Sequence, residues 1–61
     1  MIEGKIYLLM CTDQDGYDRP IFASMNGQIF RDQEKKWIAE QRDNPYWQLE
    51  SRRVEEIPFY S

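Results

Sequence analysis

Three carboxylates around a glycine are the first side chains in the sequence that could do chemistry. They are Asp13, Asp15 and Asp18. Their spacing around Gly16 suggests a calcium loop of the EF-hand type. That loop requires an oxygen ligand at its first position and a glutamate at its last. Cys11 and Phe22 occupy those two positions. We therefore interpret the stretch as an acidic turn and predict no metal site.

The sequence offers little material for catalysis. It has no histidine, so a histidine-assisted serine or cysteine nucleophile is excluded. Its one cysteine, Cys11, cannot complete the usual zinc sites, and no glycine-rich phosphate loop occurs. The adjacent carboxylates Glu55 and Glu56 are typical of solvated surface, because so short a chain rarely buries a pair. We expect a protein that is not an enzyme and has no cofactor.

Two adjacent arginines, Arg52 and Arg53, suggest a ligand site. Together with Tyr46 they could line a dimer groove for a nucleotide-like molecule, because phosphates favour arginine and bases favour aromatic faces. A nucleic-acid accessory role is the related alternative. However, the chain has eight basic and eleven acidic residues, with a net charge of −3. Nucleic-acid binders usually carry a basic face, so a nucleic-acid partner is not expected.

Aromatic residues make up 15% of the chain and gather toward its end, where they exceed what one short helix can cover. Tyrosine, tryptophan and arginine are favoured anchors of protein interfaces. Phe59 and Tyr60 either fold back as core or lie in an interface, and both alternatives remain open. The predicted partner-binding residues comprise four aromatic anchors and an acidic rim. They are Tyr46, Trp47, Phe59 and Tyr60, with Asp13, Asp15 and Asp18 as the rim.

The length of 61 residues predicts one small domain spanning the whole chain, 1–61. Such a domain buries only about 60% of its unfolded surface, so a protein partner or a homodimer would stabilise it. A single cysteine allows no intrachain disulfide. No signal peptide is evident, and no apolar run is long enough to span a membrane. We expect a cytoplasmic protein with no membrane partner.

The first half of the chain predicts strands. Residues 5–11 are apolar on both faces, as in a central strand covered on both sides, with Cys11 as a small buried filler. A polar turn follows at residues 12–18, where Gly16 can take positive φ. Residues 19–25 form a second strand, and Pro20 predicts that this strand either starts there or lies at an edge. Asn26-Gly27 is a hairpin signal, which predicts a short third strand at residues 28–30.

The second half predicts a helix and a last strand. The helix spans residues 32–42, with Asp32 as its N-cap or as an acidic residue of its first turn, and it docks through Trp37. We expect Trp37→Ala to lower the free energy of unfolding by roughly 3–5 kcal/mol. Residues 46–57 form a strand region whose alternation switches, which predicts either a bulge near residues 51–53 or two shorter segments. The fold class is α+β: a small antiparallel sheet of three to four strands with one helix on one face, in the order ββ(β)αβ.

This layout resembles the short orphan proteins of phage and prophage genomes. The pieces that carry the resemblance are Ile6-Tyr7-Leu8, Ile29-Phe30-Arg31-Asp32 and residues 46–57. The resemblance covers most of the chain as a pattern and carries over no functional residue. It implies a protein, often dimeric, that binds and blocks a host enzyme or defence complex in the host cytoplasm. The predicted function is therefore a non-enzymatic inhibitor that acts by protein binding.

Overall fold

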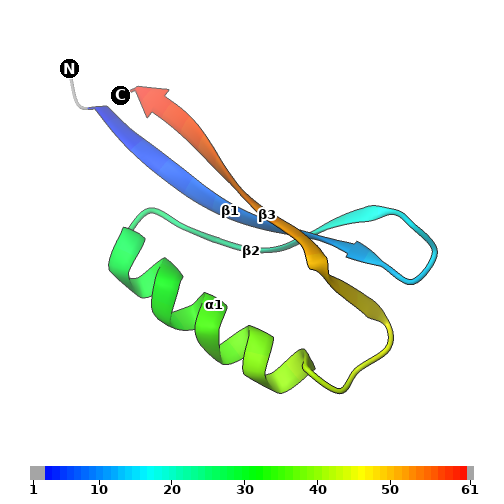
Figure 1. Ribbon diagram of the computed structural model, residues 1–61. Helices are drawn as coiled ribbons and strands as arrows, with labels where there is room; N and C mark the ends of the chain where they lie inside the picture. The colour runs from blue at the N-terminus through cyan, green and yellow to red at the C-terminus, as the bar shows by residue number, and fades with distance from the viewer. Residues whose placement is uncertain (1–2, 61) are drawn as a thin grey trace.

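The computed structural model describes residues 3–60, with side chains described for residues 4–58. Three strands and one helix follow one another along the chain (Figure 1). They are β1 (Glu3–Asp13), β2 (Asp18–Ser24), α1 (Gly27–Gln41) and β3 (Trp47–Tyr60). β1 pairs antiparallel with β2 on one side and with β3 on the other. The fold is therefore α+β in the order ββαβ, and the predicted central position of the first strand is confirmed.

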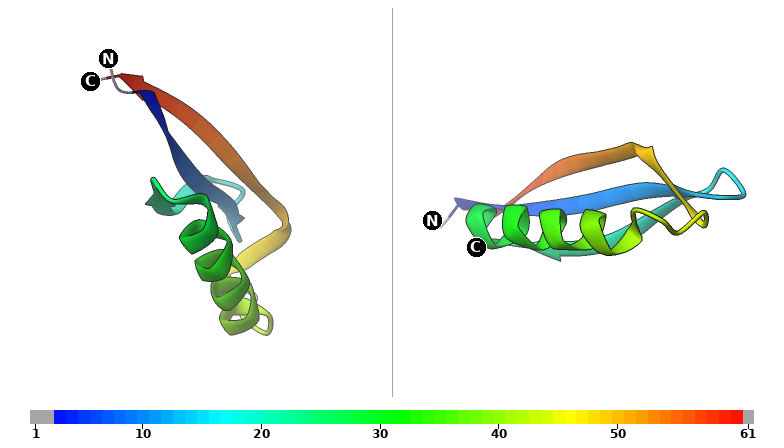
Figure 2. Two further views of the ribbon diagram at one scale, coloured as in Figure 1. Left: turned by 90° about the vertical axis from the view of Figure 1, so that its left-hand side faces the viewer. Right: turned by 60° about the horizontal axis from the view of Figure 1, so that its bottom comes forward.

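The helix covers one face of this sheet and leaves the other face open (Figures 1 and 2). Because side chains alternate along a strand, odd-numbered residues of β1 point to α1. Leu9 and Cys11 are fully buried there, and Phe30 of α1 is only 3% exposed. Leu8 and Met10, on the opposite face, remain partly exposed. The prediction that β1 is covered on both sides is therefore wrong, because α1 can reach only one face.

The turn between β1 and β2 and the edge position of β2 agree with the sequence. Gly16 has a φ of +87°, a backbone conformation that glycine adopts without steric cost. β2 pairs only with β1, so Pro20 lies in an edge strand, where its missing N–H removes no bond from the middle of a sheet. The register of the two strands shifts between Leu9 and Met10, which places an irregularity next to Pro20.

The helix begins five residues earlier than the sequence predicted. Asn26 is its N-cap, because the Oδ1 atom of Asn26 accepts hydrogen bonds from the backbone N–H groups of Gln28 (2.9 Å) and Ile29 (3.0 Å). The predicted Asn26-Gly27 hairpin and the strand at residues 28–30 are therefore wrong. Asparagine is favoured both in hairpin turns and at helix N-caps. The predicted N-cap, Asp32, lies inside the helix and accepts from Gln28 Nε2 (3.2 Å).

β3 contains the predicted irregularity, and it is larger than a single extra residue. Met10 pairs with Arg53 whereas Thr12 pairs with Gln48, so residues 49–52 all stand opposite Cys11. The location of the bulge is confirmed. β3 also continues past residue 57, and the backbones of residues 59 and 60 pair with residues 4 and 3. The question of core or interface for the Phe59 and Tyr60 side chains lies outside the described residues.

Candidate partner-binding site

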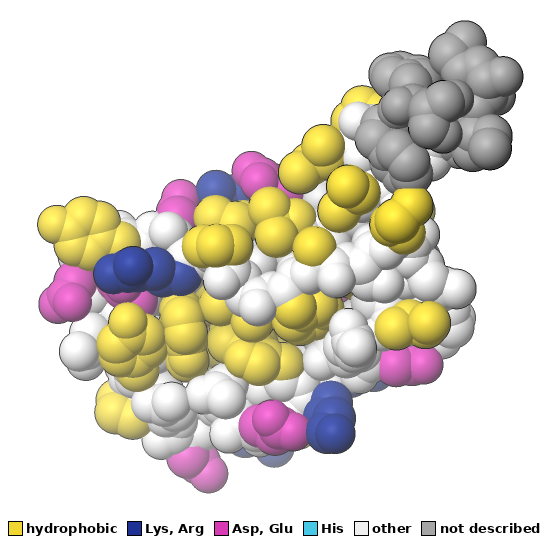
Figure 3. Space-filling view, turned by 180° about the vertical axis from the view of Figure 1, so that it is seen from behind, with side chains coloured by type: hydrophobic (Ala, Val, Ile, Leu, Met, Phe, Trp, Pro, Cys, Tyr) yellow, Lys and Arg dark blue, Asp and Glu magenta, His cyan; other side chains and the backbone are white. Residues whose placement is uncertain are grey.

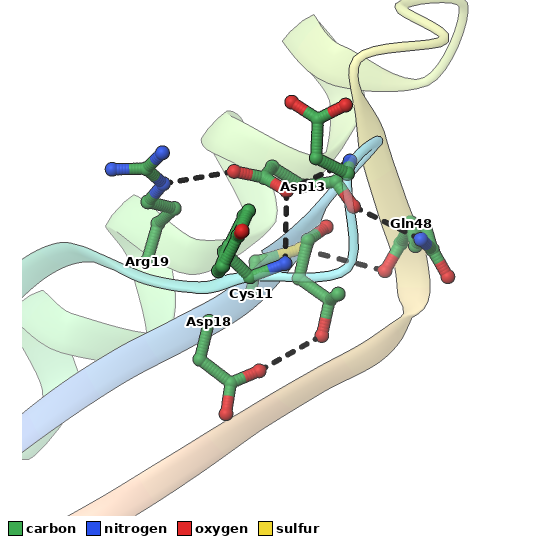
Figure 4. Close-up of polar contacts among 8 residues, drawn as sticks. Cys11, Asp13, Asp18, Arg19 and Gln48 are labelled. Carbon is green, nitrogen blue, oxygen red and sulfur yellow. Dashed lines mark hydrogen bonds and ion pairs between the residues drawn. The ribbon is translucent and has the colours of Figure 1, made fainter.

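Asp13 organises the end of the molecule where β1 turns into β2. Its Oδ1 atom accepts from the backbone N–H groups of Asp15 (2.9 Å) and Tyr17 (3.0 Å), and its Oδ2 atom accepts from Arg19 Nε (2.8 Å) (Figure 4). The side chain is fully buried. The hydrogen bond from Arg19, followed by those from the two N–H groups, lowers the pKa of Asp13 against the opposing effect of burial. An ionised carboxylate therefore holds the turn in shape.

The backbone of the same residue fixes the start of β3. The Asp13 carbonyl accepts from Gly16 N (3.1 Å) and from Gln48 Nε2 (2.9 Å). The Cys11 thiol donates to the Gln48 carbonyl at 3.5 Å, and burial raises the pKa of that thiol. Such a buried, protonated thiol serves packing. Hydrogen bonds thus join the end of β1, the turn that follows it and the start of β3 at one end of the sheet.

The burial of Asp13 shows that one residue of the predicted acidic rim was wrongly assigned. Asp13 is enclosed and all of its bonds are internal, so its side chain is not available to a partner. Asp15 and Asp18 are exposed. Asp18 accepts from Thr12 Oγ1 (3.0 Å) and forms an ion pair with Arg53 (3.0 Å). The accessible rim therefore consists of Asp15 and Asp18.

Aromatic side chains lie around the hydrogen bonds that Asp13 makes. The Trp47 ring contacts Trp37 of α1 edge-on at a centroid distance of 5.5 Å, and Tyr46 at 4.8 Å. All three rings are half-buried. Tyr17 is 64% exposed, and the Arg19 guanidinium lies 5.9 Å from its ring centre. Trp47 pairs with Asp13, and Asp13 binds Arg19, so these side chains lie at one end of the molecule. We call this end the aromatic end and define it by five residues: Tyr17, Arg19, Trp37, Tyr46 and Trp47.

An open groove between α1 and β2 continues from the aromatic end. Its volume is about 300 Å³, and Trp37 belongs both to it and to the aromatic cluster. Phe22 and Trp37 form its apolar floor, while Gln33, Lys36 and Glu40 line its rim. Figure 3 shows hydrophobic side chains exposed in a broad band on the side of the molecule seen from behind. An apolar floor with a polar rim is the usual anatomy of a protein interface.

The other predicted residues do not join this site. Phe59 and Tyr60 lie at the opposite end of β3 from Trp47 (Figure 1). The structure therefore divides the four predicted anchors between two ends of the molecule, with Tyr46 and Trp47 at the aromatic end.

The residues of the alternative ligand site also separate. Arg52 Nε lies 3.9 Å from Glu34 of α1, on the covered face of the sheet. Arg53 pairs with Asp18 and, at 3.5 Å, with Glu55 on the open face. Two arginines that point to opposite faces cannot grip the same phosphate within one chain. Tyr46 contacts Trp47 at the aromatic end, so Arg52, Arg53 and Tyr46 do not converge on one site within a single described chain, and the predicted dimer groove stays a prediction.

Sequence reasoning missed Tyr17, Arg19 and Phe22 as candidates for this site and assigned Trp37 to the core alone. The available signal was Tyr17, an aromatic residue in an otherwise polar turn with an arginine two positions later. The small number of apolar residues in α1 was a second signal that Trp37 stays partly exposed, since one helix with few apolar residues cannot enclose an indole.

A second cavity lies on the other side of α1. It measures about 180 Å³ and is lined by side chains of β1, α1 and β3: Tyr7, Gly27, Phe30, Arg31, Glu34 and Val54. Within residues 3–60, no group of three or more acidic, cysteine or histidine side chains is placed to hold a metal ion. In the same part of the chain, no helix combines the length and the apolar character needed to cross a membrane.

Comparison with known proteins found no match among protein-family models, curated protein sequences or solved structures.

Proposed function

We propose that this protein is a non-enzymatic binding module that grips another protein with its aromatic end. The observation that carries the proposal is the cluster of Tyr17, Arg19, Trp37, Tyr46 and Trp47 beside an open apolar groove. Tryptophan, tyrosine and arginine contribute most of the binding energy at protein interfaces. Here Trp37, Tyr46 and Trp47 are half-buried, which limits the entropy that they lose on binding. Tyr17 and Arg19 are exposed and can contact a partner.

The groove suits a partner that inserts a protruding apolar side chain or a short helix. Phe22 and Trp37 supply an apolar floor, and Lys36 and Glu40 supply charges of both signs at the rim. Asp15 lies on the neighbouring turn, whereas Asp18 begins β2 and pairs with Arg53. Exposed rim charges influence the association rate and the choice of partner more than they influence affinity. A partner with basic residues next to an apolar protrusion would therefore suit this end.

The resemblance to short phage orphan proteins extends the proposal to a role. In this role the protein is an inhibitor, encoded by a phage, that occludes a host enzyme or defence complex in the host cytoplasm. Its aromatic end covers part of the surface that the target needs for its own activity. This extension rests on the resemblance, whereas the binding role rests on the groove and the aromatic cluster.

A binding experiment with a matched pair of variants tests the proposal. Tagged protein captures its partner from host lysate with and without nuclease, and the affinity for the recovered partner is then measured. Tyr17→Ala removes an exposed ring at one end of β2. Met25→Ala removes an equally exposed side chain, also 64%, beyond the other end of β2. Tyr17→Ala should weaken binding at least tenfold, as expected for a hot spot, and Met25→Ala less than twofold.

Three outcomes contradict the proposal. One is equal weakening by both variants, which would place the interface elsewhere. Another is unchanged binding by Tyr17→Ala together with unchanged binding by Lys36→Glu at the groove rim. The third is loss of every captured protein after nuclease treatment, which would favour association with nucleic acid.

A further inference from the structure

The open face of the sheet, which α1 does not reach, carries apolar side chains of all three strands beside the ion pairs of Arg53 with Asp18 and Glu55. The register places side chains of all three strands on this face, because directly paired residues point to the same side. Ile6 pairs with Ile57, Leu8 with Ala23, and Met10 with Pro20. Ile57 is 43% exposed, and the three β1 residues are partly exposed. We call these six residues the open apolar face.

We infer that the open apolar face packs against the same face of a second copy of this chain. The inference goes beyond the proposed function, because it concerns a different surface and a different partner. In such a dimer the two sheets form the inner layers and the two helices form the outer layers. This architecture covers both faces of each sheet, as two-layer packing requires.

The single chain exposes more surface than a compact monomer of its mass, which favours a second molecule packed on the open face. The accessible surface is 4608 Å², whereas a compact monomer of this mass exposes about 4,250 Å². The buried apolar side chains of the described chain, Leu9, Cys11 and Phe30, all belong to the layer between the sheet and α1. Residues 3–6 of β1 pair only with β3, so that part of the sheet is a two-stranded ribbon (Figure 1). Two-stranded ribbons are marginally stable alone.

The shape of the face favours an identical partner. On this face the β2 edge carries small side chains, Pro20 and Ala23, and we call it the thin edge. The β3 edge carries large side chains, Arg53 and Ile57, and we call it the thick edge. A two-fold axis parallel to β1 places the thin edge of each copy over the thick edge of the other. The face is thereby complementary to itself in thickness.

The area is sufficient for a dimer of moderate affinity. Three strands are paired over residues 7–12 of β1 and two strands over residues 5–6. At about 4.8 Å between strands and about 3.3 Å per residue, they give a flat area of roughly 350 Å². The side chains raise the accessible surface of one face to roughly 550 Å², so two faces bury about 1,100 Å², close to the lower limit for specific interfaces. We therefore expect a dissociation constant of about 1–100 μM.

Two matched lysine substitutions test the inference by sedimentation equilibrium over a range of about 1–500 μM. Ile57 and Val54 lie on the same strand with nearly equal exposure, 43% and 44%, but on opposite faces, because Val54 pairs with Leu9 and Ile57 with Ile6. Wild type should approach twice its mass of 7.5 kDa at the highest concentrations. Ile57→Lys should weaken self-association at least tenfold, and Val54→Lys should change it less than twofold.

A second variant keeps the test decisive if Ile57→Lys does not fold. Ala23→Arg places a long cation on the thin edge of the same face, at an exposed position of β2, and it should also weaken the dimer at least tenfold. Circular dichroism of dilute samples establishes that each variant is folded. The inference is overturned if wild type stays monomeric throughout the range. It is also overturned if a folded open-face variant still dimerises normally, or if Val54→Lys disrupts the dimer equally. Binding at the aromatic end is measured separately, so either proposal can fail alone.

Discussion

Leu8 and Leu9 are neighbours of identical chemistry with opposite surroundings. Leu9 lies on the covered face of the sheet and is fully buried, whereas Leu8 lies on the open face and is partly exposed. The difference shows that an apolar strand specifies only that both of its faces favour burial. What covers each face depends on the rest of the chain. Here a single helix covers one face, and the other remains available to a second molecule.

Polar groups follow the same division. On the covered face, Asp13 is fully buried with both carboxylate oxygens bonded, and no buried side-chain N or O atom of the described residues lacks a hydrogen-bond partner. On the open face, Arg53 joins Asp18 and Glu55 in ion pairs that remain in contact with solvent. The covered face thus has the chemistry of a protein interior, whereas the open face carries solvent-exposed ion pairs beside its apolar side chains.

The largest effect should come from the helix, where two neighbours again differ. Phe30 is 3% exposed and contacts the rings of Tyr7 and Phe22, whereas Ile29 is 50% exposed. Phe30→Ala should lower the free energy of unfolding by about 3–5 kcal/mol, and Ile29→Ala by less than about 1 kcal/mol. Urea denaturation followed by circular dichroism measures both. Similar values for the two variants would mean that α1 does not dock through Phe30.

The two leucines give the sharpest comparison of the faces. Leu9→Ala should lower the free energy of unfolding by about 3 kcal/mol. Leu8→Ala should lower it by about 1 kcal/mol in dilute solution, since only part of its side chain is buried. If the open face dimerises, the effect of Leu8→Ala should grow with protein concentration. A large, concentration-independent effect of Leu8→Ala would show that its face is already covered within one chain.

Trp37 should have a smaller effect than the sequence suggested. Its ring is half-buried and rests on Trp47 at the aromatic end. We expect Trp37→Ala to lower the free energy of unfolding by about 2 kcal/mol, below the 3–5 kcal/mol expected of a fully buried aromatic residue. The midpoint of thermal unfolding checks this value. An effect as large as that of Phe30→Ala would place Trp37 in the core and weaken its assignment to a binding surface.

Acidification should act on the covered face through Asp13. The Arg19 hydrogen bond keeps the pKa of Asp13 below its ordinary value. Its stabilising effect is therefore complete above the unfolded-state pKa of about 3.9 and is lost as the pH falls through the lower folded-state pKa. Melting temperature should decrease below about pH 4. Asp13→Asn should flatten that decrease, whereas Asp15→Asn, which keeps the Asp13 carboxylate, should preserve it. Parallel profiles for the two variants would contradict this role of Asp13.

The sequence was most informative where one physical cause dominates. The apolar run in β1 predicted its central position, although not which of its faces is covered, and Gly16 predicted the turn. Pro20 was consistent with an edge strand, and the change of alternation in β3 was consistent with a bulge. Asn26 was misread because its carboxamide suits two local structures equally well. The decision between them came from Phe30, whose burial against Tyr7 and Phe22 requires a helix that begins before it.

The candidate site was less predictable than the fold, because it depends on contacts between distant residues. Trp37 and Trp47 meet only after β3 has paired with β1. Asp13 resembles any other surface aspartate in the sequence, and its enclosure depends on Arg19 and Gln48. Phe59 and Tyr60 were grouped with Tyr46 and Trp47 by nearness in sequence, but an extended strand separates its two ends.

The pairing of β1 with β3 also has a consequence for how the chain folds. β1 can close a hairpin with β2 as soon as both have been synthesised, since they are neighbours in sequence. Its other edge must wait for β3, which follows the helix and lies in the opposite half of the chain. Closing so long a loop is slow. During translation, β1 therefore has a period with one unpaired edge, when pairing with another nascent chain competes with folding.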